Sequence, residues 1–495
     1  MSFPACLVLS KETCAGAAGP LHPRASLPMM QGLRSPQPLG RDVSTADDIQ
    51  TPTTAALFGL AWPLGLKVIM LQGIVVIDAY LVSPLGEGAL AAIGLAGAII
   101  GLLLGVIFAF SNATQIRIAQ AFGAAGPVAL KTSFLCGLAI NVTMTALGII
   151  LVLIFGKQII AGFAHTPEIA TQATAFLHVF LWVAFFESIG QCLAGHFNGC
   201  GKTRIPFYSY MIAVPLNIGL SVVLIHGLYG FPALGVVGAA IGSAASSGLR
   251  VLFMAWRFAQ SDRGILATKG WSKDSFSAAL RRHWTFSLPI AGTFISMSIG
   301  TQVCMLIYAK MSVIEFAALT LILPWVQTAG VFGMAWAQAV GIAVAQLIGK
   351  GLGEAALDEF LSRAWRAAFV AAGLVALSYL TICLLAGQIY TSLQGETVAA
   401  LLTFLPFLLI LPFPKGSNAI CGQTLRASGD TLYVMNIFII GQWAFKVPMT
   451  LLFVLYLDLH VAWVFALVML EEWVKFPLFH LRLFKGEWKR AAVFD

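Results

Sequence analysis

The sequence predicts an all-α integral membrane protein, with twelve transmembrane helices in two six-helix lobes related by a pseudo-twofold axis along the membrane normal. Three observations support this fold. Of the 495 residues, 59% are hydrophobic and only 10% are charged, which is too little charge for the surface of a water-soluble protein of this length. Apolar runs of about 20 residues or more recur along nearly the whole chain. The two halves of the chain also repeat one another.

Twelve apolar segments are each long enough to cross a bilayer as a helix. A transmembrane barrel would instead show short segments of alternating hydrophobicity, and the sequence has none. The predicted helices span residues 55–82, 89–115, 133–155, 172–196, 205–228, 233–256, 283–309, 316–347, 364–387, 398–424, 431–457 and 460–483.

Lys and Arg are distributed unequally between the two sides of this bundle. The side that carries the N-terminal tail, the connections from even-numbered to odd-numbered helices, the C-terminal tail and the adjoining helix ends holds 22 of the 29 basic residues, and the opposite side holds two, Lys157 and Lys310. Because cytoplasmic loops are enriched in Lys and Arg, we expect a multi-pass protein of the inner or plasma membrane with both termini cytoplasmic. The net charge of +8 is then an orientation signal, and we expect no nucleic-acid partner.

Polar segments divide the chain into five predicted parts. The first part, residues 1–54, is rich in Pro, Ser, Ala and Gly, which predicts disorder. It lacks the charged segment followed by an apolar segment that marks a cleavable signal peptide. The longest polar connection splits the helices six and six. The parts are a disordered cytoplasmic N-terminal tail (1–54), an N-lobe with helices 1–6 (55–256), a cytoplasmic inter-lobe linker (257–282), a C-lobe with helices 7–12 (283–484) and a cytoplasmic C-terminal tail (485–495).

The two lobes are similar in sequence at a nearly constant offset. A shift of 226 residues places Gln120 on Gln346, and a shift of 228 places residues 201–203 on 429–431. Six spans separate the copies, an even number, so both have the same orientation in the membrane. The axis that relates the lobes should therefore lie along the membrane normal.

Four segments at matching spacing carry a family resemblance. Residues 61–97 contain a Pro-led helix, an Asp, a Gly turn and an Ala-rich second helix, and residues 197–245 contain G-x-T-R-x-P, an Asn in helix 5 and G-F-P-x-L-G-V-x-G-A-A. In the second half, LRASGDT at 425–431 matches the turn after helix 10, and KGEWKR at 485–490 is a typical ending. Over roughly residues 55–490 the chain resembles the multidrug and toxic compound extrusion (MATE) family.

The resemblance implies a secondary active antiporter with a central cavity that opens alternately to the two sides of the membrane. Its substrates would be small organic compounds, often cationic and amphipathic, exported against inward flow of protons or sodium. We expect no cofactor beyond this coupling ion and no obligatory protein partner. A flippase for a lipid-linked saccharide or other amphiphile is the alternative. Such proteins usually carry more cationic residues in their cavity, and Lys415 would be one here.

The sequence shows no sign of an enzyme. It contains no HExxH pair, no Walker loop and no Ser/His/Asp spacing. Its eight cysteines form no CxxC pair and no His/Cys cluster, so we expect no catalytic residues and no metal site.

Acids inside the bilayer are costly and are functional candidates by default. Asp78 lies in the outer half of helix 1 and matches the helix-1 acid of the family. A carboxyl group in a low-dielectric pocket can bind a proton near neutral pH and release it when the pocket hydrates. We therefore predict that Asp78 couples transport to the ion. The alternative is an ionised Asp whose hydrogen bonds lock helix packing.

Polar residues on helices 4, 5 and 6 are the predicted companions of Asp78. Asn217 and Ser221 share one face of helix 5, and Ser243 follows on helix 6. The resemblance places them in a cation or proton site, although they could equally join helices as packing residues. Ser221 stands where relatives have a second Asp, which weakens a sodium site and favours protons. Glu187 on helix 4 either supplies the missing charge or pairs with a basic group such as His178 or His196.

The C-lobe departs from the pattern of sodium-coupled members of the family. The resemblance implies that those relatives have a Glu in helix 7 and an Asp in helix 10. Here those positions hold Met297 and Lys415, so that cation site is expected to be absent. Lys415 follows Pro412 and Pro414, which predict a bend in helix 10. Its amine contacts an anionic substrate, pairs with Glu471 or Glu472, or reaches to an interface.

Further polar and aromatic residues are predicted either to line the substrate cavity with Lys415 or to serve in packing. Glu471, Glu472 and Lys475 of helix 12 are interpreted as structural ion pairs, with Lys446 of helix 11 as a further partner. The predicted cavity residues besides Lys415 are Gln72, Trp325, Gln327, Asn418 and Gln423.

Overall fold

A computed structural model describes residues 51–272, 275–389, 399 and 401–490, and the structural statements below concern these residues. The predicted N-terminal tail lies outside the described residues except for its last four, and the C-terminal tail except for its first six. Every regular element in the described ranges is a helix, as predicted.

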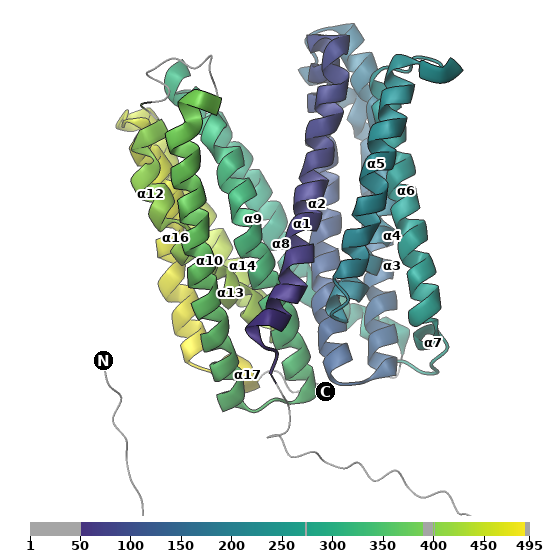
Figure 1. The fold of residues 1–495 in the computed structure, drawn as a ribbon, viewed down its shortest axis with the longest axis vertical. Coiled ribbons are helices and arrows are strands. Elements are labelled where there is room, and N and C mark those ends of the chain that lie inside the picture. Colours follow the sequence, from purple (N-terminus) through teal and green to yellow (C-terminus); the bar gives the residue numbers. More distant parts are fainter. Residues whose placement is uncertain (1–50, 273–274, 390–398, 400, 491–495) are drawn as a thin grey trace, which may run out of the picture. The chain divides into compact units, whose positions relative to one another are not determined.

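Six long helices form the N-lobe (Figure 1). Thr53 begins the first by accepting a hydrogen bond from the backbone of Ala56, and Pro127 and Pro167 occupy first turns, where a missing N–H costs nothing. Gly227 ends the fifth helix in the left-handed conformation that glycine favours. The helices are α1 (Thr54–Val82), α2 (Glu87–Gly123), α3 (Pro127–Phe163), α4 (Pro167–Gly199), α5 (Arg204–His226) and α6 (Val236–Ser261).

The C-lobe helices are more interrupted. α12 ends just before Leu411 and α13 begins at Pro412, while the predicted bend of helix 10 stays a prediction. Two stretches of π-helix follow α14. The elements are α7 (Arg263–Leu266), α8 (Phe276–Tyr308), α9 (Val313–Lys350), α10 (Glu354–Ile389), α12 (Leu405–Ile410), α13 (Pro412–Ala427), α14 (Thr431–Ile439), η4 (Ile440–Lys446), α15 (Val447–Leu451), η5 (Leu452–Tyr456), α16 (Val461–Phe484) and α17 (Glu487–Arg490).

Ten of the described helices are long and apolar enough to cross a membrane. The two remaining predicted spans differ for physical reasons. Helix 10 is broken at Pro412, and helix 12 (α16) contains Glu471, Glu472, Lys475 and Arg482. Large apolar side chains such as Leu151, Trp182 and Leu252 face outward, where lipid can cover them. With the broken helix and α16, the described part of the chain contains the twelve predicted transmembrane helices.

The connection between the lobes is shorter than its predicted bounds. α6 continues to Ser261 and α8 begins at Phe276, so helix occupies both ends of the predicted linker, and the short α7 lies between them. The division of the chain into lobes, tails and linker stays a prediction.

Equivalent residues of the two lobes meet across the interface between them. Gln120 of α2 donates a hydrogen bond to the carbonyl oxygen of Ala427 at 2.7 Å, and Gln346 of α9 donates one to the carbonyl oxygen of Gly199, also at 2.7 Å. The sequence repeat pairs Gln120 with Gln346 and Gly199 with Ala427. Such reciprocal contacts are what a twofold axis requires, so the predicted pseudo-twofold relation is confirmed.

Two glycines allow the backbones of α2 and α9 to touch at this interface. A Cβ atom on Gly123 would overlap the carbonyl oxygen of Gln346, and one on Gly349 would overlap that of Gln120. We call this region, formed by Gln120, Gly123, Gln346 and Gly349, the closed end. It lies on the side of the basic connections.

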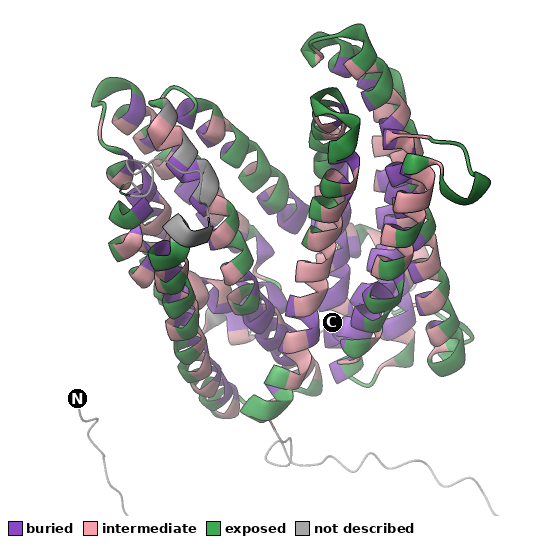
Figure 2. Cartoon of the chain, turned by 45° about the horizontal axis from the view of Figure 1, so that its top comes forward, coloured by how far each residue is buried: buried purple, intermediate pink, exposed green. Residues whose placement is uncertain are grey.

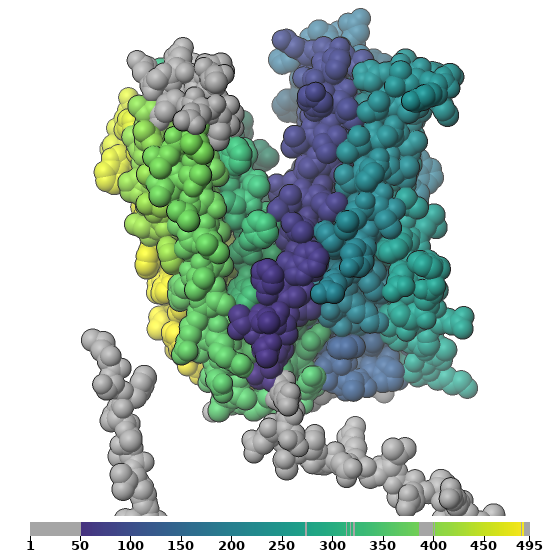
Figure 3. Space-filling view, in the orientation of Figure 1, coloured from purple at the N-terminus to yellow at the C-terminus, as the bar shows by residue number. Residues whose placement is uncertain are grey.

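The lobes part toward the other end of the helices, which we call the open end. There Val76 and Tyr80 of α1 and Leu306 of α8 are largely exposed. Figure 2 shows buried residues gathered where the lobes meet, and Figure 3 shows a hollow between the lobes beside α1 at the open end. The fold thus presents the interior faces of α1 and its neighbours to one side only.

Candidate coupling and substrate sites

Asp78 lies in a small polar cluster inside the N-lobe. Its side chain is 7% exposed, and its Oδ2 accepts a hydrogen bond from the hydroxyl of Ser243 at 2.9 Å. The amide of Asn217 in turn donates to the Ser243 hydroxyl at 3.0 Å. The structure therefore brings together three of the predicted coupling residues from α1, α5 and α6.

Three oxygen atoms around this cluster have spare hydrogen-bonding capacity. Asp78 Oδ1, Asn217 Oδ1 and Ser221 Oγ are all buried and have no partner among the described residues. Ser221 is fully buried against Gly242, where a Cβ atom would overlap its hydroxyl. Because buried polar atoms are normally paired, these oxygen atoms can bind one more group. A proton on Asp78, a water molecule or a cation would each serve.

Glu187 lies in a second cluster, which satisfies its charge fully. Arg250 of α6 binds both carboxylate oxygens, at 2.6 and 3.3 Å, and Gln191 and Ser247 donate further hydrogen bonds at 2.7 and 3.2 Å. The guanidinium group also lies 3.9 Å from the ring centre of Tyr210. Such a two-pronged, hydrogen-bonded pair is the arrangement in which a buried charge is tolerated.

Glu187 does pair with a basic group, as the alternative prediction stated, but that group is neither of the two suggested histidines. Its partner is Arg250, while His196 faces Asp262 at 3.6 Å. Ser243, Ser247 and Arg250 lie on one face of α6, so Ser243 reaches Asp78 while Ser247 and Arg250 reach Glu187. This spacing was the available sequence signal for Arg250.

The acids of α16 form the predicted ion pairs. Glu471 binds Lys446 at 2.9 Å and Lys475 at 3.1 Å, and Glu472 binds Lys475 at 2.7 Å. Asn418 of α13 donates to the side chain of Glu472 at 2.9 Å. All of these acids have basic partners, so Asp78 is the buried carboxylate without one in the described part of the chain.

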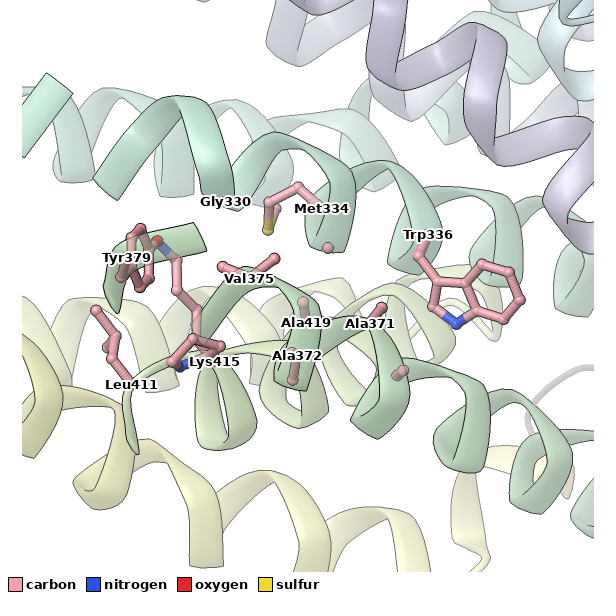
Figure 4. A pocket seen from close by; sticks show the side chains of 14 residues that line it. Gly330, Met334, Trp336, Ala371, Ala372, Val375, Tyr379, Leu411, Lys415 and Ala419 are labelled. Atoms are coloured by element: carbon pink, nitrogen blue, oxygen red, sulfur yellow. The ribbon is translucent and has the colours of Figure 1, made fainter. Parts of the chain in front are cut away.

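Lys415 is not paired with Glu471 or Glu472, so that alternative is wrong. The side chain of Lys415 makes no hydrogen bond or ion pair with any described residue. It lines a cavity between α9, α10 and α13 (Figure 4). The ammonium lies beside Gly330, whose Cβ atom, if present, would be 3.6 Å from Nζ.

The MatE family model matches residues 63–223 and 289–452, one stretch in each lobe. The chain belongs to the MatE family. An uncharacterised transporter of Bacillus subtilis, YisQ, is 22% identical over 464 residues, covering 91% of this chain and 98% of YisQ. A probable multidrug resistance protein, NorM, of Bradyrhizobium diazoefficiens is 25% identical over 409 residues, covering 79% of this chain and 84% of NorM.

Solved structures confirm the fold. A crystal structure of MATE in a bent conformation has a TM-score of 0.77 at 21% identity and covers 89% of this chain and 97% of its own. A MOP superfamily transporter from Pyrococcus furiosus, for which the reverse polarity of the binding pocket suggests a different function, has a TM-score of 0.74 at 20% identity and covers 89% of this chain and 96% of its own. MatE proteins are transporters, and this chain is a multi-pass membrane protein of that family.

The other predicted substrate residues of this MatE chain do not line the Lys415 cavity. Gln72 of α1 and Gln327 of α9 are exposed, and Trp325 is half-buried. Gln423 is buried against Gly341, and Asn418 holds α13 to α16 through Glu472.

Asp262, outside the membrane-spanning helices, anchors a polar contact that the sequence did not indicate. It accepts hydrogen bonds from Lys202 at 2.9 and 3.0 Å. Burial favours a higher pKa for this carboxyl, but hydrogen bonds from His196, Ser261 and Lys202 outweigh burial and hold the pKa well below its ordinary value. Asp262 thereby fastens the end of α6 to the start of α5.

Proposed function

We propose that this MatE protein is a secondary active antiporter that exports amphipathic organic compounds in exchange for protons, with Asp78 as the group that binds the proton. One observation carries the proposal: Asp78 is buried, has no basic partner among the described residues and retains a carboxylate oxygen without a hydrogen bond. The NorM similarity supports the substrate class, since that relative is named as a probable multidrug resistance protein.

The chemistry of the cluster favours a proton. A buried carboxylate without a counter-ion is costly, and proton uptake removes the charge. The neutral acid then supplies a donor in a cluster where the Asn217 carbonyl oxygen lacks one. A sodium ion would instead need several oxygen ligands with compensating negative charge, and this cluster offers one carboxylate among neutral groups.

Alternating access supplies the transport step. We assign the closed end to the cytoplasm because the basic connections lie there. The structure is then open to the outside, where protons reach the N-lobe. Reversal requires Gln120 and Gln346 to release the opposite lobe.

Transport by the purified full chain in liposomes tests this function. A fluorescent amphipathic substrate is exported under an imposed pH gradient or an imposed sodium gradient, for wild type and for Asp78→Asn. Export driven by the pH gradient and lost in Asp78→Asn is expected. Asp458→Asn, an exposed Asp in the loop before α16, is the matched control and should retain transport.

The other outcomes separate the alternatives. Export driven by sodium alone would show that the cluster around Asp78 binds sodium. Unchanged proton-driven export in Asp78→Asn would reduce Asp78 to a packing residue. Movement of lipid-linked saccharides in place of soluble amphiphiles would favour a flippase.

A further inference from the structure

We propose that the Lys415 cavity of the C-lobe binds an anionic head group, so that the exported compounds include amphiphiles with a carboxylate or similar single negative charge. The inference rests on the proposed export function and specifies its substrate class. It also departs from the cationic substrates that the family resemblance implies.

The charges around Lys415 leave its ammonium uncompensated. Three lysines, Lys415, Lys446 and Lys475, lie within electrostatic range of two acids, Glu471 and Glu472. Glu471 is bound by Lys446 and Lys475, and Glu472 by Lys475. Both acids are therefore bound by other lysines, and Lys415, the lysine that faces the cavity, has no acid paired with it among the described residues. An anion beside Lys415 would balance this charge, whereas a cation would be repelled.

The remaining polar groups of the cavity are already engaged. The Tyr379 hydroxyl donates to the carbonyl oxygen of Val326 at 3.0 Å, and the Trp336 indole donates to that of Ala364 at 3.1 Å. Within the described lining, the Lys415 ammonium is thus the side-chain donor that is free to bind a ligand. A buried or half-buried charged donor without a partner is rare in proteins and calls for a ligand.

The shape of the cavity fits a small head group on a larger apolar body. Half of its lining residues are glycine or alanine, such as Gly330, Gly333 and Ala372, and at Gly330 there is no α9 side chain to cover the ammonium. Its volume of about 30 Å³ is room for about two water molecules, the space that a carboxylate needs. Met334, which is 46% exposed, marks the side on which an apolar body can continue.

The breaking of helix 10 places Lys415 at this position. Pro412 begins α13, and Lys415 is its fourth residue, beside α9 and α10 (Figure 4). Its backbone N–H donates to the carbonyl oxygen of Leu411 at 3.2 Å, so the side chain that faces the cavity extends from a helical backbone.

Equilibrium binding of two matched probes tests the inference without any ion gradient. Dansylglycine carries a carboxylate, and dansylglycinamide has the same body with a neutral amide. Binding to the full chain in lipid nanodiscs is followed by dansyl fluorescence. Wild type should bind dansylglycine at least about tenfold more tightly than the amide, as expected for one charged hydrogen bond.

Substitutions at Lys415 should change this preference selectively. Lys415→Gln should bind the two probes alike, and Lys415→Arg should restore the preference for the carboxylate. Lys310→Gln, which removes an exposed lysine in the loop between α8 and α9, is the control and should bind as wild type. Thermal unfolding of each variant identifies a loss of fold.

The results distinguish this inference from the export function. Equal binding of the two probes by folded wild type, no binding of dansylglycine, or an unchanged preference in Lys415→Gln would overturn the anion site. Carboxylate-selective binding without any gradient-driven transport would leave the anion site standing and remove the proposed export.

Discussion

The hydrogen bonds of Gln120 and Gln346 are expected to hold the closed end together, and their removal should shift the protein toward the opposite conformation. Each glutamine donates at 2.7 Å to a backbone carbonyl of the other lobe. When leucine replaces either glutamine, the backbone carbonyl that the glutamine bound has no hydrogen-bond partner while the lobes are in contact. When the lobes separate, water can bind that carbonyl. An acceptor left without a partner costs about 1–3 kcal/mol. Each single substitution should therefore raise the separated population about 5- to 150-fold.

Thiol labelling measures this population. Ala343 of α9 is 1% exposed and packs in the core shared by the two lobes, so Ala343→Cys reacts with a maleimide only when the closed end opens. The six described native cysteines are buried, which keeps background labelling low. Cys6 and Cys14 are replaced by serine.

The expected labelling rate of Gln346→Leu is at least about fivefold above that of the parent, since the rate follows the open population when this is small. The double substitution Gln120→Leu with Gln346→Leu should exceed either single one. Gln327→Leu changes an exposed glutamine of the same helix and should label as the parent. Labelling of the double variant within twofold of the parent would refute the assignment of these bonds to the gate.

Three further predictions concern packing and stability. Gly123→Ala places a Cβ atom on the Gln346 backbone, so the closed end should fail to form and maleimide labelling should rise while the fold persists. Arg250→Met leaves Glu187 buried without its counter-ion and should lower the free energy of unfolding by about 3–5 kcal/mol, and replacing both residues by neutral ones should recover most of the loss. Because the pKa of Asp262 is depressed in the folded protein, its contribution to stability is present above its ordinary pKa of about 3.9 and is lost as pH falls through its folded value. Asp262→Asn should therefore lower the melting temperature at pH 7, and the difference from wild type should shrink toward pH 3; a constant difference would contradict the ion-pair role.

Local sequence patterns predicted the fold because the bilayer imposes its length on every helix. Apolar runs of sufficient length predicted the transmembrane helices. The constant sequence offset that relates Gln120 to Gln346 predicted the twofold axis, which the hydrogen bonds of these two residues confirm. Helix 12 was also predicted from the sequence, although its charged residues lower its hydropathy. The helix ends were less predictable, since α6 and α8 extend by polar turns into the predicted linker.

The site was predictable only where a residue acts within a known pattern. Asp78, Asn217 and Ser243 occupy the positions of a polar site of the family, although relatives often have Thr in place of Ser243, and the three side chains do meet. The partner of Glu187 lies 63 positions along the chain, and no local spacing relates α4 to α6. Likewise, Lys415 has no acid as a partner because Lys446 and Lys475 bind Glu471 and Glu472. Which lysine binds which acid depends on distances in the folded protein, which the sequence does not show.

The two proposals together predict that export responds to membrane potential. If one proton enters at Asp78 while one monoanion leaves from the Lys415 cavity, two charges move in the same electrical sense. Each charge is worth about 2.3 kcal/mol per 100 mV, so an inside-negative potential of that size favours export by about 4.6 kcal/mol. Exchange of a proton for a monovalent cation would be electroneutral. In liposomes with a potassium diffusion potential and no pH gradient, dansylglycine should therefore be driven out when the interior is negative, provided that the closed end faces inward. A dansylglycine flux that ignores the potential would show that the substrate leaves without its negative charge, and would exclude coupled proton and anion exchange with this stoichiometry.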